Sequence, residues 1–597
     1  MEQPAVRETN QPSRDPGDMT VNSRAGRGYR PIADYAMVGD AQSGALIASD
    51  GGVDWLCLPH FDSPAILCRL LDADRGGFLA ITPAANPISM TRSYRPASNV
   101  LDTTFNLPNG GVTITDAMPF ADGDPTPPLD GIWGGHGRHR LIRLVTATKA
   151  PATIYLTARI AFDFAATPAR IDLLPGRGAI LDDGAGRFLA LRWRGSLIID
   201  DDGVLRGEMP LDRDESTVCV LGWARDQEDA LRILDKRNWE RQVAETDSAW
   251  REWASHCHAD GPFAEAILRS ALTLKMMTFE PSGAVIAALT TSLPEEIGGV
   301  RNWDYRYCWL RDATFTLYAL LLVGDRMAAA AFWRWIERTC VPSGAANLQV
   351  MYGINGQRDL PERTLDHLSG YRDSRPVRVG NAAADQCQLD IYGELLDAFW
   401  FYFQQGRRED SPPIDRGVWE LMRDVADHIC EVWRFPDQGL WEVRSGPRHF
   451  VYSKVMCWVG LDRAIRLCEL DEFDAEPSRW IGERDALMEE ILARGFNPAI
   501  NSFTMAYDSS DLDAALLRLP LVGFLPAADA RIVGTIDRIQ AELRGKFIDR
   551  DFHRECRLAQ AIAANRPGRH GVGINRIGVD LLGWASVNRQ RFATGVV

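Results

Sequence analysis

The 597-residue sequence lacks the phosphate-binding and metal-binding signatures that many enzymes carry. It contains no GxxxxGK[ST] or GxGxxG phosphate loop, no HExxH motif and no clustered His-Cys spacing. A Gly-x-Ser-x-Gly segment, the usual turn that presents a hydrolase serine, is also absent. The sequence therefore predicts chemistry that requires no metal, no cofactor and no serine nucleophile of that type.

Long apolar runs and paired cysteines are missing as well. No stretch approaches the roughly 20 apolar residues that a membrane span requires, and the N-terminal residues lack the apolar centre of a secretory signal. The cysteines show no CxxC or paired spacing, which is typical of reduced thiols. We therefore expect a soluble, cytoplasmic protein without a membrane partner, in which the polar residues 1–28 form a disordered leader.

Positive charge is scarcer than negative charge. Lys and Arg number 66 against 81 Asp and Glu, which gives a net charge of -15. A phosphate backbone would be repelled by such a chain, so the composition argues against a nucleic-acid partner and leaves neutral or polar ligands open. At 597 residues the chain is too long for one hydrophobic core and predicts two or three domains, while the oligomeric state does not follow from the sequence.

The first part of the chain predicts a β-sandwich. Two short apolar runs flank the turn at residues 50–52, Asp-Gly-Gly, which is the pattern of a β-hairpin. Further segments alternate apolar and polar residues between Gly, Pro and Asp turns, so we place an all-β domain at 29–225. The predicted strands are 112–118, 141–147, 152–160, 188–193, 197–200 and 217–223.

After residue 225 the periodicity becomes helical. Residues 226–260 are charged and predict a linker helix region. From residue 261 apolar residues recur at steps of three and four, and the loops between these segments hold most of the Gly, Pro and aromatic residues. Such paired helices favour an α/α toroid at 261–545, although periodicity does not separate it from an α-solenoid. The predicted helices are 264–278, 312–322, 326–339, 389–404, 416–433, 453–470, 481–495 and 527–543.

The stretch from Gly439 to Trp458 carries the strongest catalytic candidate. Glu442 lies beside Trp441, and a carboxylate against an indole face is poorly solvated, so the pKa of Glu442 should rise. A carboxyl that stays protonated at neutral pH can act as a general acid. A loop glutamate paired with a neighbouring arginine is the alternative. Candidate substrate contacts in this stretch are Trp441, Arg444 and Lys454, with Arg448 as a further donor.

A second stretch, from Arg301 to Asp312, interleaves four aromatic residues with charged ones. This mixture makes a poor core and a good sugar site, because aromatic faces pack on a pyranose while charged groups bond its hydroxyls. The alternative is an aromatic-rich helix entry stabilised by ion pairs. The pair Glu295 and Glu296 is a weaker candidate for catalysis, since adjacent side chains point in different directions.

Both stretches resemble glycoside hydrolase family 15, the glucoamylase and trehalase family. The likeness rests on Trp-Glu-Val-Arg-Ser-Gly-Pro-Arg-His with the following Ser-Lys, and on Arg-Asn-Trp-Asp-Tyr-Arg-Tyr-Cys-Trp-Leu-Arg-Asp, and it runs from about residue 29 to 544. It implies a β-sandwich followed by an (α/α)6-type toroid, with Glu442 as the general acid of an inverting, exo-acting glycosidase. The resemblance assigns Arg311 and Asp312 to the distal hydroxyls of the terminal glucose, with Trp303 and Asp304 close by.

Two further blocks, 348–371 and 380–397, are similar to family segments on the substrate side of the toroid. They hold second-rank candidates for the site, and for any one of these a structural hydrogen bond is the competing role. The four candidates are Arg358, Asp359, Gln386 and Asp390.

The resemblance fails in the tail at 546–597. Family members carry a second catalytic glutamate near the C-terminus, whereas the last glutamate here is Glu555, outside any matching motif. The tail holds nine Lys or Arg against four Asp or Glu and shows little helical periodicity. We interpret it as an atypical terminus, either aberrant or genuinely divergent, and expect a toroid that is incomplete at its C-terminal end, without an identified general base and with impaired activity.

The sequence thus predicts a glycosidase that releases glucose from an α-linked glucoside, a small molecule or an oligosaccharide. Trehalose is the alternative substrate to a maltooligosaccharide. Two other classes stay open: an impaired glucan-binding or trehalose-binding homologue, which the missing base favours, and a phosphorolytic or transferase α/α-barrel in which phosphate replaces water. Inversion needs an acid and a base roughly 6.5–9.5 Å apart, and the sequence supplies only the acid.

Overall fold

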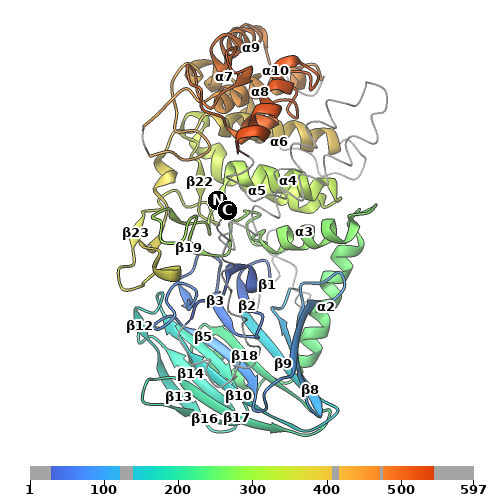
Figure 1. Ribbon diagram of the computed structural model, residues 1–597, viewed down its shortest axis with the longest axis vertical. Coiled ribbons are helices and arrows are strands. Elements are labelled where there is room, and N and C mark those ends of the chain that lie inside the picture. Colours follow the sequence, from blue (N-terminus) through green and yellow to red (C-terminus); the bar gives the residue numbers. More distant parts are fainter. Residues whose placement is uncertain (1–27, 121–138, 407–415, 445, 471–474, 544–597) are drawn as a thin grey trace, which may run out of the picture.

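The computed structural model describes residues 28–120, 139–406, 416–444, 446–470 and 475–543. Strands form one end of the molecule and helices the other (Figure 1). Within these ranges all ten cysteines are free, and no helix combines the length and the apolar character needed to cross a membrane. The leader, apart from Gly28, and the tail at 546–597 lie outside the described residues.

Two eight-stranded antiparallel sheets make up the β domain, as predicted. The first sheet contains, in spatial order, β1 (Tyr35–Gly39), β2 (Gly44–Ala48), β3 (Val53–Cys57), β5 (Phe78–Pro83), β10 (Ala152–Arg159), β17 (Leu205–Leu211) and β16 (Ser196–Ile199), with β4 (Ala65–Leu67) paired to β3. The second contains β13 (Arg170–Leu174), β14 (Gly178–Asp182), β15 (Phe188–Arg192), β18 (Ser216–Ala224), β9 (Arg140–Thr148), β8 (Gly110–Ala117), β7 (Leu101–Leu107) and β6 (Ser89–Tyr94). A short hairpin of β11 (Ala161–Phe162) and β12 (Thr167–Pro168) lies apart from both.

The period-two alternation that predicted the strands has a direct cause in the fold. In β17 the side chains alternate strictly between buried and exposed positions, because successive residues of a strand point to opposite faces of the sheet. The buried faces of the two sheets form one apolar core. The hairpin predicted about the turn at 50–52 is confirmed, since β2 pairs with β3 and Gly51 adopts a φ of +77° at that turn.

One buried ion pair crosses this core. Arg143 of β9 donates to both carboxylate oxygens of Asp116 on β8, at 2.7 and 3.1 Å. Its remaining donors reach the carbonyl oxygens of Leu79 and Gly51, which belong to the first sheet and its β2–β3 turn. Both side chains are 0% exposed. The pair therefore ties the two sheets together at a position where either charge alone would be strongly destabilising.

The charged segment predicted as a linker forms two helices, α1 (Gln227–Asp235) and α2 (Trp239–Ser255). The break falls at Asn238, whose φ of +72° cannot continue a helix. Helix α1 packs on β15 and β18 and covers the outer face of the second sheet. Helix α3 (Ala264–Met276) is then the first helix of the helical domain (Figure 1).

The following helices alternate between an inner and an outer layer. Helices α4 (Leu310–Leu322), α6 (Asp390–Gly406) and α8 (Val451–Cys468) pack side by side, and α8 is buried on all its faces. Helices α5 (Arg326–Cys340), α7 (Arg416–Val432) and α9 (Ser478–Glu490) lie outside them. Helix α7 buries a single face, on which apolar residues recur at steps of three and four. This alternation is that of an α/α toroid, and α10 (Ala530–Leu543) is the last described helix. The prediction of an incomplete ring concerns residues 544–597, outside the described ranges.

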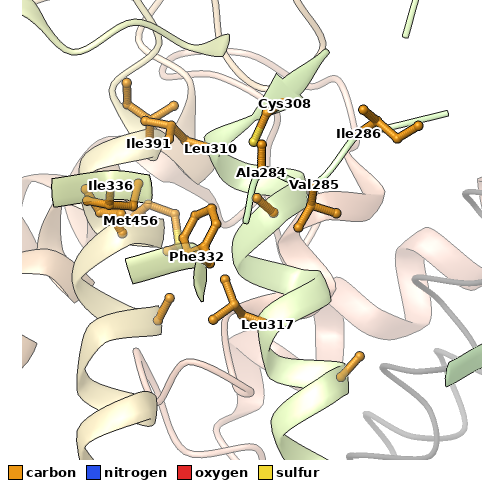
Figure 2. Packing of buried hydrophobic residues seen from close by; sticks show 14 of the residues in the cluster. Ala284, Val285, Ile286, Cys308, Leu310, Leu317, Phe332, Ile336, Ile391 and Met456 are labelled. Carbon is orange, nitrogen blue, oxygen red and sulfur yellow. The ribbon is translucent and has the colours of Figure 1, made fainter. Parts of the chain in front are cut away.

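Apolar side chains from several helices lock the layers together. Figure 2 shows one cluster built from Leu310 and Leu317 of α4, Phe332 and Ile336 of α5, Ile391 of α6 and Met456 of α8. Helices α6 and α8 approach closely at Gly393, where a Cβ atom would lie 1.9 Å from the Met456 carbonyl oxygen. A larger residue at position 393 would therefore force the two inner helices apart.

Short two-stranded antiparallel sheets lie in the segments between the helices. They are β19 (Thr291–Pro294) with β20 (Asn302–Asp304), β21 (Cys308–Trp309) with β22 (Met351–Tyr352), β23 (Arg363–Thr364) with β24 (Arg378–Val379), and β25 (Phe496–Asn497) with β26 (Ser502–Phe503). The β domain supports some of these loops directly, since the Trp55 indole donates to the Leu289 carbonyl oxygen at 2.8 Å. The loops that carry the site are thus braced by both domains.

The ion pair across the sandwich gives a stability prediction. Replacing Arg143 by Met should lower the free energy of unfolding by about 3–5 kcal/mol, because Asp116 would remain buried without a counter-charge. The double variant Arg143→Met/Asp116→Leu should recover much of that loss. Urea denaturation followed by tryptophan fluorescence measures both. Arg241→Met, which removes an exposed ion pair with Glu245, serves as the control, and an equal loss in it and in Arg143→Met would contradict the prediction.

Candidate active site

The two stretches that the sequence singled out meet at the carboxyl of Glu442. The Trp309 indole N–H donates to Glu442 Oε1 at 2.7 Å, although the two residues are 133 positions apart. The Arg311 guanidinium lies 3.7 Å from the same oxygen, and the Glu442 side chain is 20% exposed. Trp309 ends β21 and Arg311 is the second residue of α4, so the entry of one inner helix presents both groups to the acid candidate.

Opposing influences set the pKa of Glu442. Burial raises it, and the negative charge of Asp312 adds to that rise. The positive charge of Arg311 and the hydrogen bonds from Trp309 and Gln388 act in the opposite direction, and the net pKa lies above the ordinary value for a glutamate. The predicted rise is thus present, and its cause is burial by the surrounding loops.

The predicted indole partner was wrong. The Trp441 N–H donates to both oxygens of Asp513 at 3.1 Å, and its side chain is 41% exposed. The indole that contacts Glu442 is Trp309, which bonds through its N–H and so favours the ionised form. Glu442 has a φ of +54°. Because this left-handed conformation turns the chain sharply, neighbours in sequence need not share an environment.

Arg311 is fixed from three directions. It donates to Gln388 and Asp390 at 2.8 Å each, and to the Leu440 carbonyl oxygen at 3.2 Å. Arg311 is 7% exposed, and Asp390 is fully buried. The second-rank candidate Asp390 therefore acts by holding Arg311 in place beside the acid.

Gln386 supports the same arrangement at one remove. Its side chain donates to the Glu442 carbonyl oxygen at 3.4 Å and accepts from Gln388 at 3.0 Å. Gln388 was not among the predicted site residues. The signal that could have identified it is the spacing of 386, 388 and 390, since alternate residues of an extended segment point the same way.

Two further groups surround the acid. Asp312, in the first turn of α4, is partly exposed and lies within electrostatic reach of Glu442 and Arg311. Tyr305, which was not predicted, stacks at a tilt on Trp309 with 5.6 Å between ring centroids. Burial and the charge of Glu442 raise the pKa of Tyr305, so its hydroxyl stays protonated and can donate.

Trp303 and Arg444 contact each other. The Arg444 guanidinium lies 4.1 Å from the Trp303 ring centroid, and that of Arg378 lies 4.5 Å from it. Glu362 pairs with both arginines, at 2.9 Å to Arg444 and 3.1 Å to Arg378. Trp303 and Arg444 therefore form part of a cation–π and ion-pair cluster near Glu442, and Glu362 is a member that the sequence did not indicate.

Asp304 and Lys454, which the sequence predicted as substrate contacts, bond other parts of the protein. Both oxygens of Asp304 bond Arg306, at 2.8 and 2.7 Å, and both residues are fully buried. Arg306 in turn donates to the Ser63 carbonyl oxygen of the β domain at 2.8 Å. The ammonium of Lys454, also fully buried, donates to the carbonyl oxygens of Trp433 and Phe435.

The remaining candidates lie on a loop that the structure does not connect to Glu442. Arg358 donates to the Ser343 hydroxyl at 2.8 Å and to the Asn347 carbonyl oxygen at 2.7 Å, so it holds a loop. Asp359 is exposed beside it. In the described ranges no group of three or more His, Cys, Asp or Glu side chains could hold a metal ion. The tail, in which the sequence shows no general base, lies outside the described residues.

Known proteins share both parts of this architecture. The family model described as Glycosyl hydrolases family 15 matches residues 261–551, and the one described as Trehalase-like, N-terminal matches residues 23–177. A trehalase of Mycolicibacterium smegmatis is 36% identical over 537 residues, which cover 86% of this chain and 77% of the relative. A trehalase of Thermoplasma acidophilum is 34% identical over 501 residues, which cover 83% of this chain and 82% of the relative.

A solved structure gives the same fold. A bacterial glucoamylase complexed with acarbose superposes with a TM-score of 0.62 at 13% sequence identity, covering 86% of this chain and 79% of that one. The predicted β domain followed by an (α/α)6-type toroid is thereby confirmed. Because the relatives exceed 30% identity over most of the chain, this protein is a glycosidase that belongs to glycosyl hydrolase family 15.

Proposed function

We propose that this glycosidase hydrolyses α,α-trehalose to two molecules of glucose with inversion at the attacked carbon. The observation that carries the proposal is the similarity to trehalases along more than four-fifths of the chain, together with the trehalase-like N-terminal segment at 23–177. The sequence led us to expect glucoamylase-like release of glucose from maltooligosaccharides. That activity now becomes the competing substrate assignment.

In the proposed mechanism Glu442 is the proton donor. Its carboxyl gives a proton to the glycosidic oxygen as the bond from that oxygen to the anomeric carbon breaks. A water molecule attacks the same carbon from the opposite face, and a carboxylate base removes the proton of that water. One glucose leaves through the protonated oxygen, and the other keeps the oxygen of the water.

Arg311 and Asp312 hold the terminal glucose in this proposal. A guanidinium that is already anchored by Asp390 and Gln388 can offer its remaining donors to sugar hydroxyls without first being ordered. Its position 3.7 Å from Glu442 also stabilises the carboxylate that forms when the proton has left. Arg311 thus links recognition of the sugar to the proton transfer.

A second function has one specific observation in its favour. The tail holds no glutamate within a motif of the family's base loop, which favours a homologue that binds trehalose or a glucan without turnover. Chromatography of the products from trehalose, maltose and maltotriose, with and without phosphate, separates the possibilities. Glucose from trehalose alone supports the proposal, glucose from maltose favours glucoamylase, phosphate dependence indicates phosphorolysis, and binding without any product identifies the impaired homologue.

The role of Glu442 gives a direct prediction. Glu442→Gln should lower kcat/KM for trehalose by at least about 100-fold, because a positioned general acid contributes about 10²–10⁴-fold. Its effect on α-glucosyl fluoride should be much smaller, since fluoride leaves without a proton. The exposed Glu245→Gln is the control. Unchanged turnover of trehalose in Glu442→Gln would remove this residue from the mechanism.

The electrostatic surroundings of Glu442 predict opposite pH shifts for two variants. The Trp309 hydrogen bond lowers the pKa of Glu442 and the charge of Asp312 raises it. Trp309→Phe should therefore raise that pKa and extend activity on trehalose to higher pH, whereas Asp312→Asn should lower it and end activity at lower pH. The basic limb of the kcat/KM profile measures both shifts. Movement of the two limbs in the same direction would contradict the assignment.

A further inference from the structure

The backbone at Glu442 is in a conformation that needs support. Its φ of +54° lies in the left-handed region, which is unfavourable for a residue with a side chain and persists only where the surroundings impose it. The hydrogen bonds of its own peptide groups are long, at 3.2 Å from its N–H to the Gly439 carbonyl oxygen and 3.4 Å from Gln386 to its carbonyl oxygen. Other contacts must therefore hold the acid loop, which we define as residues 439–444.

On one side of Glu442 the loop is held by Asp513. This carboxylate receives the Trp441 N–H at 3.1 Å on both oxygens and also receives the Ala515 backbone N–H at 2.9 Å. Asp513 is 4% exposed, whereas Trp441 is 41% exposed. Packing alone does not immobilise a half-exposed indole, so the hydrogen bond to a fixed, buried carboxylate sets the position of Trp441.

On the other side the loop is held by Glu362. The Arg444 guanidinium bonds Glu362 at 2.9 Å and covers the Trp303 ring at 4.1 Å. Glu362 is itself fixed by the Ala382 N–H at 3.2 Å and by Arg378 at 3.1 Å. Burial opposes the ionisation of Glu362, but the bonds from Arg444 and Ala382 outweigh it and keep its pKa below the ordinary value.

We propose that Asp513 and Glu362 are positioning residues for the general acid, acting as two clamps on the residues one before and two after Glu442. Together they hold the left-handed turn that aims the carboxyl at Trp309 and Arg311. The inference rests on the proposed role of Glu442 as proton donor. It assigns to Trp441 and Arg444 a part in holding the loop in addition to any contact with substrate.

Other parts of the chain provide a matched comparison. The Trp480 indole donates to Asp427 at 2.8 Å, which is the same chemical bond as that between Trp441 and Asp513. It joins α9 to α7, away from the acid loop. Loss of this bond should affect stability without affecting proton donation, so Asp427→Ser, which shortens the acceptor as Asp513→Ser would, separates a positioning effect from a general structural effect.

The experiment compares two substrates with different needs for acid catalysis. Asp513→Ser keeps the cap on Ala515, since serine is a good helix N-cap, but it is too short to reach Trp441. Trp441→Phe removes the same bond from the other partner. Each should lower kcat/KM for trehalose by about 10–100-fold, the range for a misplaced catalytic group. The value of kcat/KM for α-glucosyl fluoride should change by less than about threefold. The double variant should be no worse than the worse single one.

Glu362→Gln should act in the same direction with a smaller effect, because the Arg444 side chain is 45% exposed and water can replace part of its pairing. Asp427→Ser should leave the ratio of kcat/KM for the two substrates unchanged. The clamp would be overturned if kcat/KM fell equally for trehalose and α-glucosyl fluoride in the Asp513 and Trp441 variants. Additive effects of Asp513→Ser and Trp441→Phe would also overturn it.

The proposed function and the clamp can fail separately. If the unmodified protein hydrolyses neither substrate, the proposed hydrolysis fails, and the clamp is then tested through the affinity of 1-deoxynojirimycin, whose cation pairs with an ionised Glu442. Calorimetry should show about tenfold weaker binding in Asp513→Ser and Trp441→Phe and unchanged binding in Asp427→Ser. Equal affinity in all four proteins would overturn the clamp.

Discussion

A buried guanidinium at the start of α4 organises the site. Arg311 is 7% exposed, so its charge must be matched by groups that are themselves fixed. Asp390 supplies the opposite charge from the first turn of α6, Gln388 supplies an amide oxygen, and the acid loop supplies the Leu440 carbonyl. The two inner helices and the acid loop are thereby held at one point, and Glu442, the proposed proton donor, lies beside it.

Buried pairs of a carboxylate and an arginine recur along one face of α6. Asp390, Glu394 and Asp397 follow one another at steps of four and three, so they lie on one face of the helix. Each pairs with an arginine from a different segment, and the three distances are all 2.8 Å. The arginines are Arg311, Arg518 and Arg463, in that order. Buried pairs of this kind add little net stability, but a mispaired arrangement would be costly, so they specify how the inner helices align around the site.

The fold was predictable from the sequence because periodicity depends on local geometry. Strands of period two and helices of period 3.6 appear wherever one face is buried, and the main departure was the break at Asn238, where a single left-handed residue divides one charged segment into two helices.

The site was predictable only in part. Asp304 and Lys454 are charged residues in the right motifs, yet both are fully buried, and burial of a charge depends on partners that are distant in the chain.

The pairing of Glu442 with an indole shows the limit most clearly. Proximity in sequence favoured Trp441, but the left-handed turn at Glu442 directs the carboxyl to Trp309, 133 residues earlier. The exchange matters chemically. An indole face would only have raised the pKa, whereas an indole N–H stabilises the carboxylate.

The resulting balance suits a proton donor better than burial alone would. Burial and Asp312 favour the protonated form that must be present before the reaction, while Arg311 and Trp309 favour the carboxylate that exists after it. A donor whose two states are close in free energy at the working pH transfers its proton with the smallest barrier. Because Trp309, Arg311 and Asp312 all belong to the entry of one helix, the orientation of the Glu442 carboxyl toward that entry also determines its acidity.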